Sequence, residues 1–181
     1  MADSVDQDFE KFYNKALKFL SYRPRSEKEV GDRLRIRNQE SGIRNLDLLI
    51  DQVIQKLKEY NFLSDLGFAK KWIEERRRLK PRSLRLIKLE LRRKGISEEI
   101  IESIIHDSRF MIQSDLEQAK ILVQKRLQRL KGLPTEEIFQ KLGRYLVARG
   151  FDWDTIKKAI DPVRSQSKED LDRDKNPHED L

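Results

Sequence analysis

The chain has 181 residues, of which 39% are charged and 37% are hydrophobic, and its formal net charge at pH 7 is +7. This composition offers less core-forming material than an ordinary globular chain and favours a polyanionic partner. The absence of cysteine excludes disulfides, thiol catalysis and sulfur-ligated zinc, and only His106 and His178 could titrate near neutral pH. The longest apolar runs are too short for a membrane span, and the opening MADSVDQDFE lacks the features of a secretory signal. We therefore expect a cytoplasmic protein that does not contact the membrane.

Apolar residues recur every three or four positions almost throughout the chain, and no segment alternates as a β-strand does. Serine or proline marks several helix starts, at Ser26, Ser83, Ser97 and Pro134. The pattern predicts an all-α fold. Its nine expected helices cover residues 8–21, 26–39, 45–60, 64–79, 82–94, 97–106, 113–131, 135–149 and 152–160.

Two sequence repeats sort these helices into groups of three. The tripeptide Pro-Arg-Ser at 24–26 recurs at 81–83, and KGISEEIIESII at 94–105 aligns without a gap with RGFDWDTIKKAI at 149–160. Such repetition predicts three tandem three-helix repeats, helix-turn-helix-like units that form an elongated curved array. The expected domains are a first repeat over 8–63, a second repeat with a basic belt over 64–108, a third repeat over 109–162, and a disordered acidic tail over 163–181.

The sequence offers little that could support catalysis. His106 precedes Asp107 at a helix end, where a lone histidine more often satisfies carbonyl groups and the helix dipole. The pairs Lys94-Gly95 and Lys131-Gly132 have the character of helix ends followed by a capping glycine, not of phosphate-binding loops. We therefore expect no enzyme activity, no cofactor and no metal site.

Positive charge is concentrated in the middle of the chain, where residues 66–94 include twelve basic and three acidic side chains. A helix over 82–94 would place Arg85, Lys88 and Arg92 on one face, beside an apolar stripe. Such a cluster favours an anionic partner, and the alternative is a solvated face with surface ion pairs. The predicted binding residues are Arg23, Arg25, Arg76, Arg77, Arg78, Lys80, Arg82, Arg85, Lys88, Arg92, Arg93, Lys94, Lys125, Arg126 and Arg129.

Few aromatic residues are available to stack on nucleic-acid bases. Trp72 has helical spacing from Phe68 and is expected to pack within the protein, as is Phe151. Trp153 is a candidate partner-facing anchor, and Tyr22 could either stack on a base or pack on the Pro24 turn.

Three segments together resemble the bacterial RecX family of recombination regulators. The first, ALKFLSYRPRSEKEVGDRL at 16–34, is similar to the family's opening motif. The second, VIQKLKEYNFLSDLGFAKKWIEER at 53–76, is similar to its core motif, although Asn61 stands where the family usually has glycine. The third, LKPRSLRLIKLELRRKGISEEII at 79–101, matches its Pro…Glu-Leu…Lys-Gly-Ile run. Residues 35–45 form an insertion-like stretch that departs from the family pattern.

The resemblance implies a nine-helix crescent of three trihelical repeats and a negative regulator of the RecA recombinase. Such a regulator would bind in the groove of the RecA filament on single-stranded DNA, directly or within the filament. It would suppress filament extension, ATP hydrolysis, strand exchange and co-protease activity without being an enzyme. We expect a monomer. Two alternatives remain: an autonomous DNA-binding helical module of architectural or transcriptional type, and a helical scaffold for an acidic protein.

Overall fold

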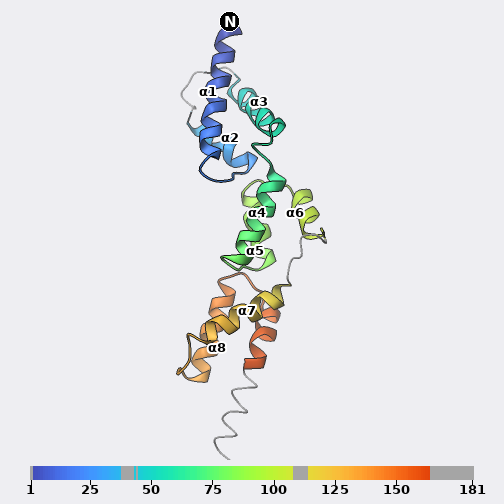
Figure 1. Cartoon of the computed structure of the whole chain (residues 1–181). Helices are drawn as coiled ribbons and strands as arrows, with labels where there is room; N and C mark the ends of the chain where they lie inside the picture. Colours follow the sequence, from blue (N-terminus) through green and yellow to red (C-terminus); the bar gives the residue numbers. More distant parts are fainter. Residues whose placement is uncertain (1, 38–42, 44, 108–113, 164–181) are drawn as a thin grey trace, which may run out of the picture. The chain divides into compact units, whose positions relative to one another are not determined.

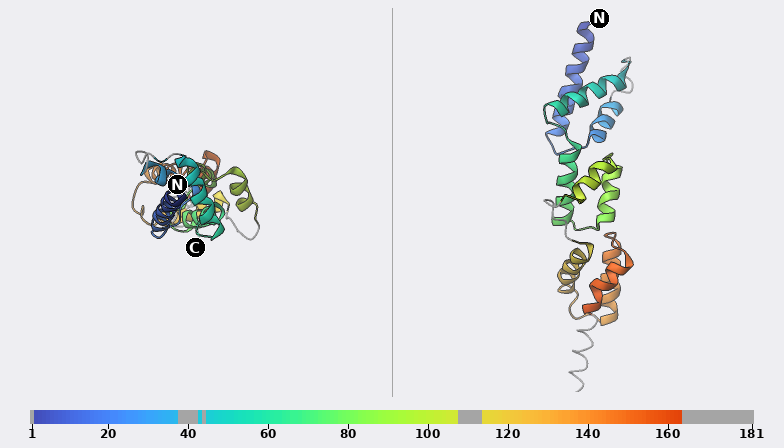
Figure 2. Two further views of the ribbon diagram at one scale, coloured as in Figure 1. Left: turned by 90° about the horizontal axis from the view of Figure 1, so that it is seen from above. Right: turned by 90° about the vertical axis from the view of Figure 1, so that its right-hand side faces the viewer.

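A computed structural model describes residues 2–37, 43, 45–107 and 114–163. These residues form helices joined by short turns and contain no β-strand, as the coloured ribbon shows (Figures 1 and 2). Eight helices carry labels: α1 (Ala2–Leu20), α2 (Glu27–Ile36), α3 (Leu46–Glu59), α4 (Asp65–Arg78), α5 (Leu84–Arg93), α6 (Glu98–Ile105), α7 (Asp115–Leu127) and α8 (Thr135–Val147). A further helix covers 153–163. The prediction of an all-α chain with nine helices is confirmed for the described residues.

Helix limits follow the signals in the sequence at most ends. The hydroxyl oxygen of Ser26 accepts the backbone N–H of Glu29, and the Glu29 carboxylate in turn accepts the N–H of Ser26, a reciprocal capping box that starts α2. Ser114 and Glu117 start α7 in the same way. Most other helix ends differ from the predicted ranges by one to three residues, and two differ by more: α1 begins at Ala2 instead of residue 8, and α7 ends at Leu127 instead of residue 131.

Residues with positive φ lie in several of the turns that follow helices. Gly95, Gly132 and Gly150 have φ angles of 84°, 88° and 83°, and Gly95 and Gly150 are the glycines that the repeat alignment pairs. Asn61, at the position where the resemblance leads to an expectation of glycine, also has a positive φ of 58°. Asparagine tolerates this conformation better than most side chains, so the departure from the family motif preserves the turn.

The chain divides into two compact units: residues 1–74 with 89–110, and residues 75–88 with 111–181. The division falls inside α4 and α5, so each of these helices contributes residues to both units. The four-part division predicted from the sequence, at residues 63, 108 and 162, stays a prediction. The predicted tail over 163–181 lies outside the described residues except for Val163.

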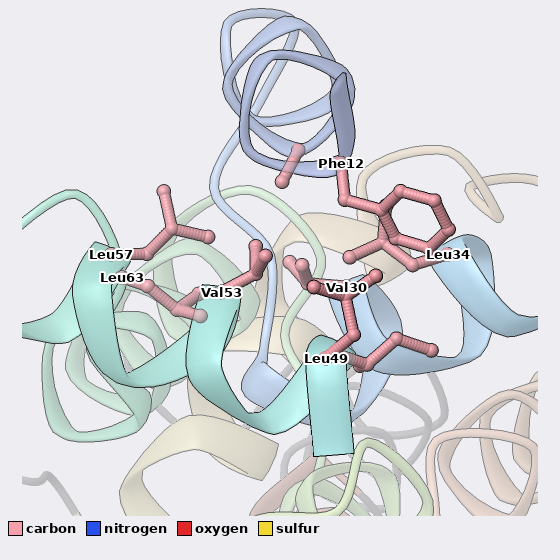
Figure 3. Packing of buried hydrophobic residues seen from close by; sticks show 9 residues of the cluster. Phe12, Val30, Leu34, Leu49, Val53, Leu57 and Leu63 are labelled. Atoms are coloured by element: carbon pink, nitrogen blue, oxygen red, sulfur yellow. The ribbon is translucent and has the colours of Figure 1, made fainter. Parts of the chain in front are cut away.

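The first unit contains a core in which α1, α2 and α3 pack on one another. Figure 3 shows Phe12 of α1 and Leu34 of α2 converging on the face of α3 that carries Leu49 and Val53. All four side chains are buried. Burying a side chain of this size contributes about 1.5–3 kcal/mol, so this small core stabilises the three-helix repeat.

The second unit has its own core, where α7 packs on α8. Ala119 and Val123 of α7 are buried with Leu142 and Leu146 of α8 and with Phe151 after the turn. The burial of Phe151 confirms the prediction that it belongs to the core.

Trp72 of the first unit also packs within the protein as predicted. It is half-buried, stacks on Phe68 with ring centroids 5.5 Å apart and donates its Nε1–H to Glu90.

Candidate nucleic-acid interface

A basic groove of about 500 Å³ lies entirely within the second unit. Its walls come from the end of α4 and the turn that follows, from α7 and its C-terminal extension, and from the end of α8. Seven of its twelve lining residues are cationic and none is acidic. The cationic residues are Arg78, Lys80, Arg82, Lys125, Arg126, Arg129 and Arg149.

Local sequence explains why these cations point outward. Leu122 and Val123 are buried in the core, and Lys125, Arg126 and Arg129 follow on the next turns of the α7 segment, where they are exposed or half-buried. Arg78 closes α4, where the helix dipole favours a positive charge. Pro81 then holds the turn that carries Lys80 and Arg82. The sequence predicted six of the seven cations as binding residues, and the structure brings these six together.

The seventh cation, Arg149, and the one aromatic residue of the lining, Tyr145, were missed from the sequence. The guanidinium carbon of Arg149 lies 3.7 Å from the centre of the Tyr145 ring, and that of Arg126 lies 5.1 Å from it. Arg149 Nη1 also donates to the backbone carbonyl of Tyr145 at 3.3 Å. The repeat alignment pairs Arg149 with Lys94, a predicted binding residue, so the repeat itself could have identified it.

Three predicted binding residues of the first unit make contacts within the protein instead. Arg23 and Lys94 both donate to the Glu29 carboxylate, at 3.0 Å and 2.7 Å. Arg25 lies over the ring of Phe19, 4.0 Å from its centre, and burial lowers its pKa. These side chains help to hold the Pro24 turn against the end of α5.

Two further residues of the predicted belt are engaged in the same way. Arg92 makes a two-pronged pair with Glu98, at 2.7 Å and 2.8 Å. Arg85 donates to the backbone carbonyl of Gly150 at 3.2 Å. For these two residues, the contacts agree with the alternative interpretation of the belt, in which surface cations pair with neighbouring groups of the protein.

Arg77 is the most buried cation of the set, with 12% of its side chain exposed. Its Nη2 lies 3.4 Å from Asp115 Oδ1, and burial lowers the pKa of Arg77 although the Asp115 carboxylate opposes the shift. Asp115 also accepts the backbone N–H of Leu84, which starts α5. Arg77 is therefore a structural cation of the second unit.

Three predicted binding residues remain. Arg76 and Lys88 are half-buried and Arg93 is exposed, and none of the three lines the groove.

A smaller hollow of about 440 Å³ lies in the first unit, between the end of α1 and α2. Phe19 and Leu34 line it, together with the exposed Tyr22, and four cations, Lys15, Lys18, Arg33 and Arg37, surround it. Of these residues, the sequence indicated only Tyr22 as a candidate contact residue.

The described residues offer little for catalysis or metal binding. Within the described ranges, no three or more histidine, aspartate or glutamate side chains are grouped so that they could hold a metal ion. His106 directly follows α6, and its Nε2 lies 3.4 Å from Oε2 of Glu102, one helical turn earlier. His178 lies outside the described residues. Among the described helices, none combines the length and the apolar character that crossing a membrane requires.

Three family models match the chain in order. They are the first three-helix domain of RecX at residues 13–43, the second at 64–104 and the third at 113–160.

Relatives that share this organisation have the name regulatory protein RecX. The protein from Prosthecochloris aestuarii is 34% identical over 158 residues, which cover 87% of this chain and 97% of that protein. The protein from Bacillus subtilis is 31% identical over 167 residues, covering 92% of this chain and 60% of that protein. The chain thus spans about 60% of the length of several of the Bacillus relatives that it matches.

Two solved structures share the fold. The crystal structure of RecX from Lactobacillus salivarius superimposes with a TM-score of 0.65 at 28% identity, covering 91% of this chain and 99% of that one. A second crystal structure of a regulatory protein RecX gives a TM-score of 0.67 at 22% identity, covering 88% of this chain and 76% of that one. These matches confirm the tandem three-helix repeats.

Proposed function

Because this chain belongs to the RecX family, we propose that it is a negative regulator of the RecA recombinase. In this proposal it binds in the groove of the filament that RecA forms on single-stranded DNA. It inhibits filament extension, ATP hydrolysis, strand exchange and co-protease activity by occupying the filament, and it performs no chemistry of its own. It acts as a monomer in the cytoplasm.

The observation that carries this proposal is the basic groove of the second unit. Seven cations converge there without an acidic side chain in the lining, and such an arrangement is costly unless an anionic partner neutralises it. Nucleoprotein filaments present phosphates along their length, and each phosphate that a cation neutralises releases counterions and favours binding. The groove therefore supports an electrostatic contribution to filament binding.

The proposal is tested by measuring the single-strand-dependent ATP hydrolysis of RecA while this protein is added below the concentration of RecA. We expect inhibition at such ratios, because one bound regulator can stop the growth of a whole filament. The protein alone should hydrolyse no ATP. Inhibition that begins only when the protein saturates the DNA would contradict filament binding and favour the autonomous DNA-binding module.

A pair of matched variants tests the part that the groove plays. Lys125→Glu with Arg129→Glu reverses two charges of the groove, whereas Lys157→Glu with Lys158→Glu reverses two exposed charges of the 153–163 helix, outside the groove lining. Both change the net charge equally. The groove variant should need about tenfold more protein for half-inhibition, and the control should resemble the unmodified protein. Equal inhibition by both variants would remove the groove from the proposal.

A further inference from the structure

The hollow between the end of α1 and α2 has a positively charged rim, and it belongs entirely to the first unit. None of the described residues that line it is acidic, and four of the seven are exposed cations, Lys15, Lys18, Arg33 and Arg37. In the described part of the chain, no carboxylate lies within ion-pair distance of Lys18 or Arg37. The rim is therefore open to an anionic group from outside the protein.

The bottom of the hollow is apolar. Leu34 of α2 has 2% of its surface exposed, and Phe19 of α1 is half-buried. Tyr22 also lines the hollow and leaves 73% of its surface exposed. The guanidinium carbon of Arg33 lies 5.3 Å from the centre of the Phe19 ring, so the charged rim and the apolar bottom adjoin. An apolar centre inside a polar rim is the usual composition of a surface that binds another protein.

The lining favours an acidic peptide over a nucleic-acid strand. A base that entered the hollow would bury N–H donors at its edge, and the Tyr22 hydroxyl is the one acceptor among the described lining side chains. A buried donor without an acceptor is costly, whereas an apolar side chain has no such cost. A phosphate backbone alone would leave the apolar bottom in contact with water. An acidic peptide matches both parts, because its carboxylates pair with the rim and an apolar side chain fills the bottom.

We propose that this hollow binds an acidic segment of another protein, with one apolar side chain of the segment buried against Phe19 and Leu34. The inference goes beyond the proposed function and does not rest on it, since the basic groove belongs to the other unit. A volume of about 440 Å³ is within the range of pockets that hold a ligand group. Burial of the apolar side chain provides most of the affinity, and the four cations select for carboxylates beside it.

The ligand chemistry is tested by selecting random twelve-residue peptides, displayed on phage, for binding to the full chain. We expect the selected peptides to share one large apolar residue with acidic residues on both sides of it. The strongest binder is then synthesised with blocked ends and a fluorescent label, and its dissociation constant is measured by anisotropy. Selected peptides without this combination, or a selection that enriches no peptide, would overturn the proposal.

Two altered peptides separate the apolar contribution from the charge. Replacing the apolar residue of the selected peptide with serine should weaken binding by about tenfold or more. Replacing its acidic residues with the corresponding amides should weaken binding by about fivefold or more at low salt and should remove most of the salt dependence. Undiminished binding by either altered peptide would contradict the proposed combination. Oligothymidylate at the same charge concentration should compete at least about tenfold less well than the unlabelled peptide, because its bases leave donors unpaired. Equal competition would assign the hollow to nucleic acid.

The apolar part of the site is located with two matched tyrosines of the first unit. Tyr22→Ser changes a residue of the lining, whereas Tyr60→Ser changes an exposed tyrosine outside it. Tyr22→Ser should weaken peptide binding by about fivefold, and Tyr60→Ser should change it by less than about twofold. Equal effects of the two substitutions would overturn the location.

The charged rim is located with two matched pairs of charge reversals. Lys18→Glu with Arg37→Glu should weaken peptide binding by about tenfold or more. Lys125→Glu with Arg129→Glu makes the same change of net charge in the basic groove and should weaken it by less than about threefold. Lys18→Gln with Arg37→Gln replaces the first pair if its unfolding curve shows a loss of structure. A stronger effect of the groove pair would place the acidic peptide in the groove and overturn the assignment to the hollow.

Discussion

The side-chain hydroxyl of Ser26 donates a hydrogen bond of 2.6 Å to the backbone carbonyl of Lys94, 68 positions away in the sequence. Its oxygen also caps α2 by accepting the N–H of Glu29. Ser83 repeats the arrangement in the second unit, where it donates to the carbonyl of Gly150 at 2.7 Å and accepts the N–H of Leu86. Each Pro-Arg-Ser serine thus caps one helix and holds the glycine turn of another.

Replacing Ser26 with alanine should lower the free energy of unfolding of the first unit by about 2 kcal/mol. The cap contributes about 1 kcal/mol, and the part-buried carbonyl of Lys94 also loses its hydroxyl donor. Urea unfolding followed by Trp72 fluorescence, in a Trp153→Phe background, reports on the first unit because these are the two tryptophans of the chain. Ser21→Ala removes an exposed hydroxyl that donates to Lys18 and should cost under about 0.5 kcal/mol. Equal losses from both substitutions would contradict the role given to Ser26.

Asp115→Ala should destabilise the second unit by about 3 kcal/mol or more. It removes the anion that faces the buried Arg77 and the acceptor of the Leu84 N–H, and an uncompensated buried charge is the larger cost. Trp153 fluorescence in a Trp72→Phe background follows this unit. The combined change Arg77→Met and Asp115→Asn removes both charges and keeps an acceptor, so it should recover most of the loss. A combined variant as unstable as Asp115→Ala would show that the pair is not the source.

Gly150→Ala should be markedly more destabilising than Gly132→Ala, although both glycines belong to the second unit and have nearly equal positive φ. An added Cβ at Gly150 would lie 2.7 Å from the Cβ of Leu86, whereas at Gly132 it would meet nothing within 4 Å. We expect about 1 kcal/mol from backbone strain alone at Gly132 and about 1–3 kcal/mol more at Gly150 from overpacking. Urea unfolding monitored through Trp153 measures both, and similar losses would exclude the steric cause.

The first unit should lose stability in acid through Glu29. Burial acts to raise the pKa of Glu29, but hydrogen bonds from Lys94, Arg23 and the Ser26 N–H more than offset it, so the folded pKa lies below the ordinary value of 4.5. The stability that Glu29 contributes is fully present above pH 4.5. It is lost as the pH falls through the lower pKa that Glu29 has in the folded protein. Glu29→Gln should therefore flatten the dependence of unfolding free energy on pH in this window. An unchanged slope would contradict the assignment.

Asp65 gives the matched comparison with the opposite sign. Burial raises the pKa of Asp65 above its ordinary value of 3.8, although the N–H of Glu27 donates to it. Asp65 therefore binds a proton more readily in the folded protein than in the unfolded chain. This protonation adds stability as the pH falls from the pKa of the folded protein toward 3.8. Asp65→Asn keeps an acceptor for Glu27 and should make acid unfolding steeper. A flatter profile would show the sign to be wrong.

Local and repeating features of the fold were predictable from the sequence. Ser26 and Ser83 start helices because their side chains satisfy free N–H groups, and the aligned glycines 95 and 150 share a left-handed conformation because the repeat preserves the turn. The sequence did not indicate which cations pair with carboxylates inside the protein and which line the groove. Arg77 and Asp115 are 38 positions apart, and no local pattern indicates that they meet. The sequence predicted six of the groove's cations from their clustering. Tyr145 was missed, although Arg149 follows it by one helical turn, because its contact with Arg126 joins two helices that are distant in the sequence.

The pairing of each Pro-Arg-Ser serine with a glycine turn in the following repeat also constrains how this architecture can change. The partners of Ser83 and Leu84, namely Gly150 and Asp115, come from a different copy of the three-helix motif. A fragment that stops before residue 108 would leave the start of α5 without either partner. The copies are therefore not interchangeable modules, because each junction is completed by residues of two copies.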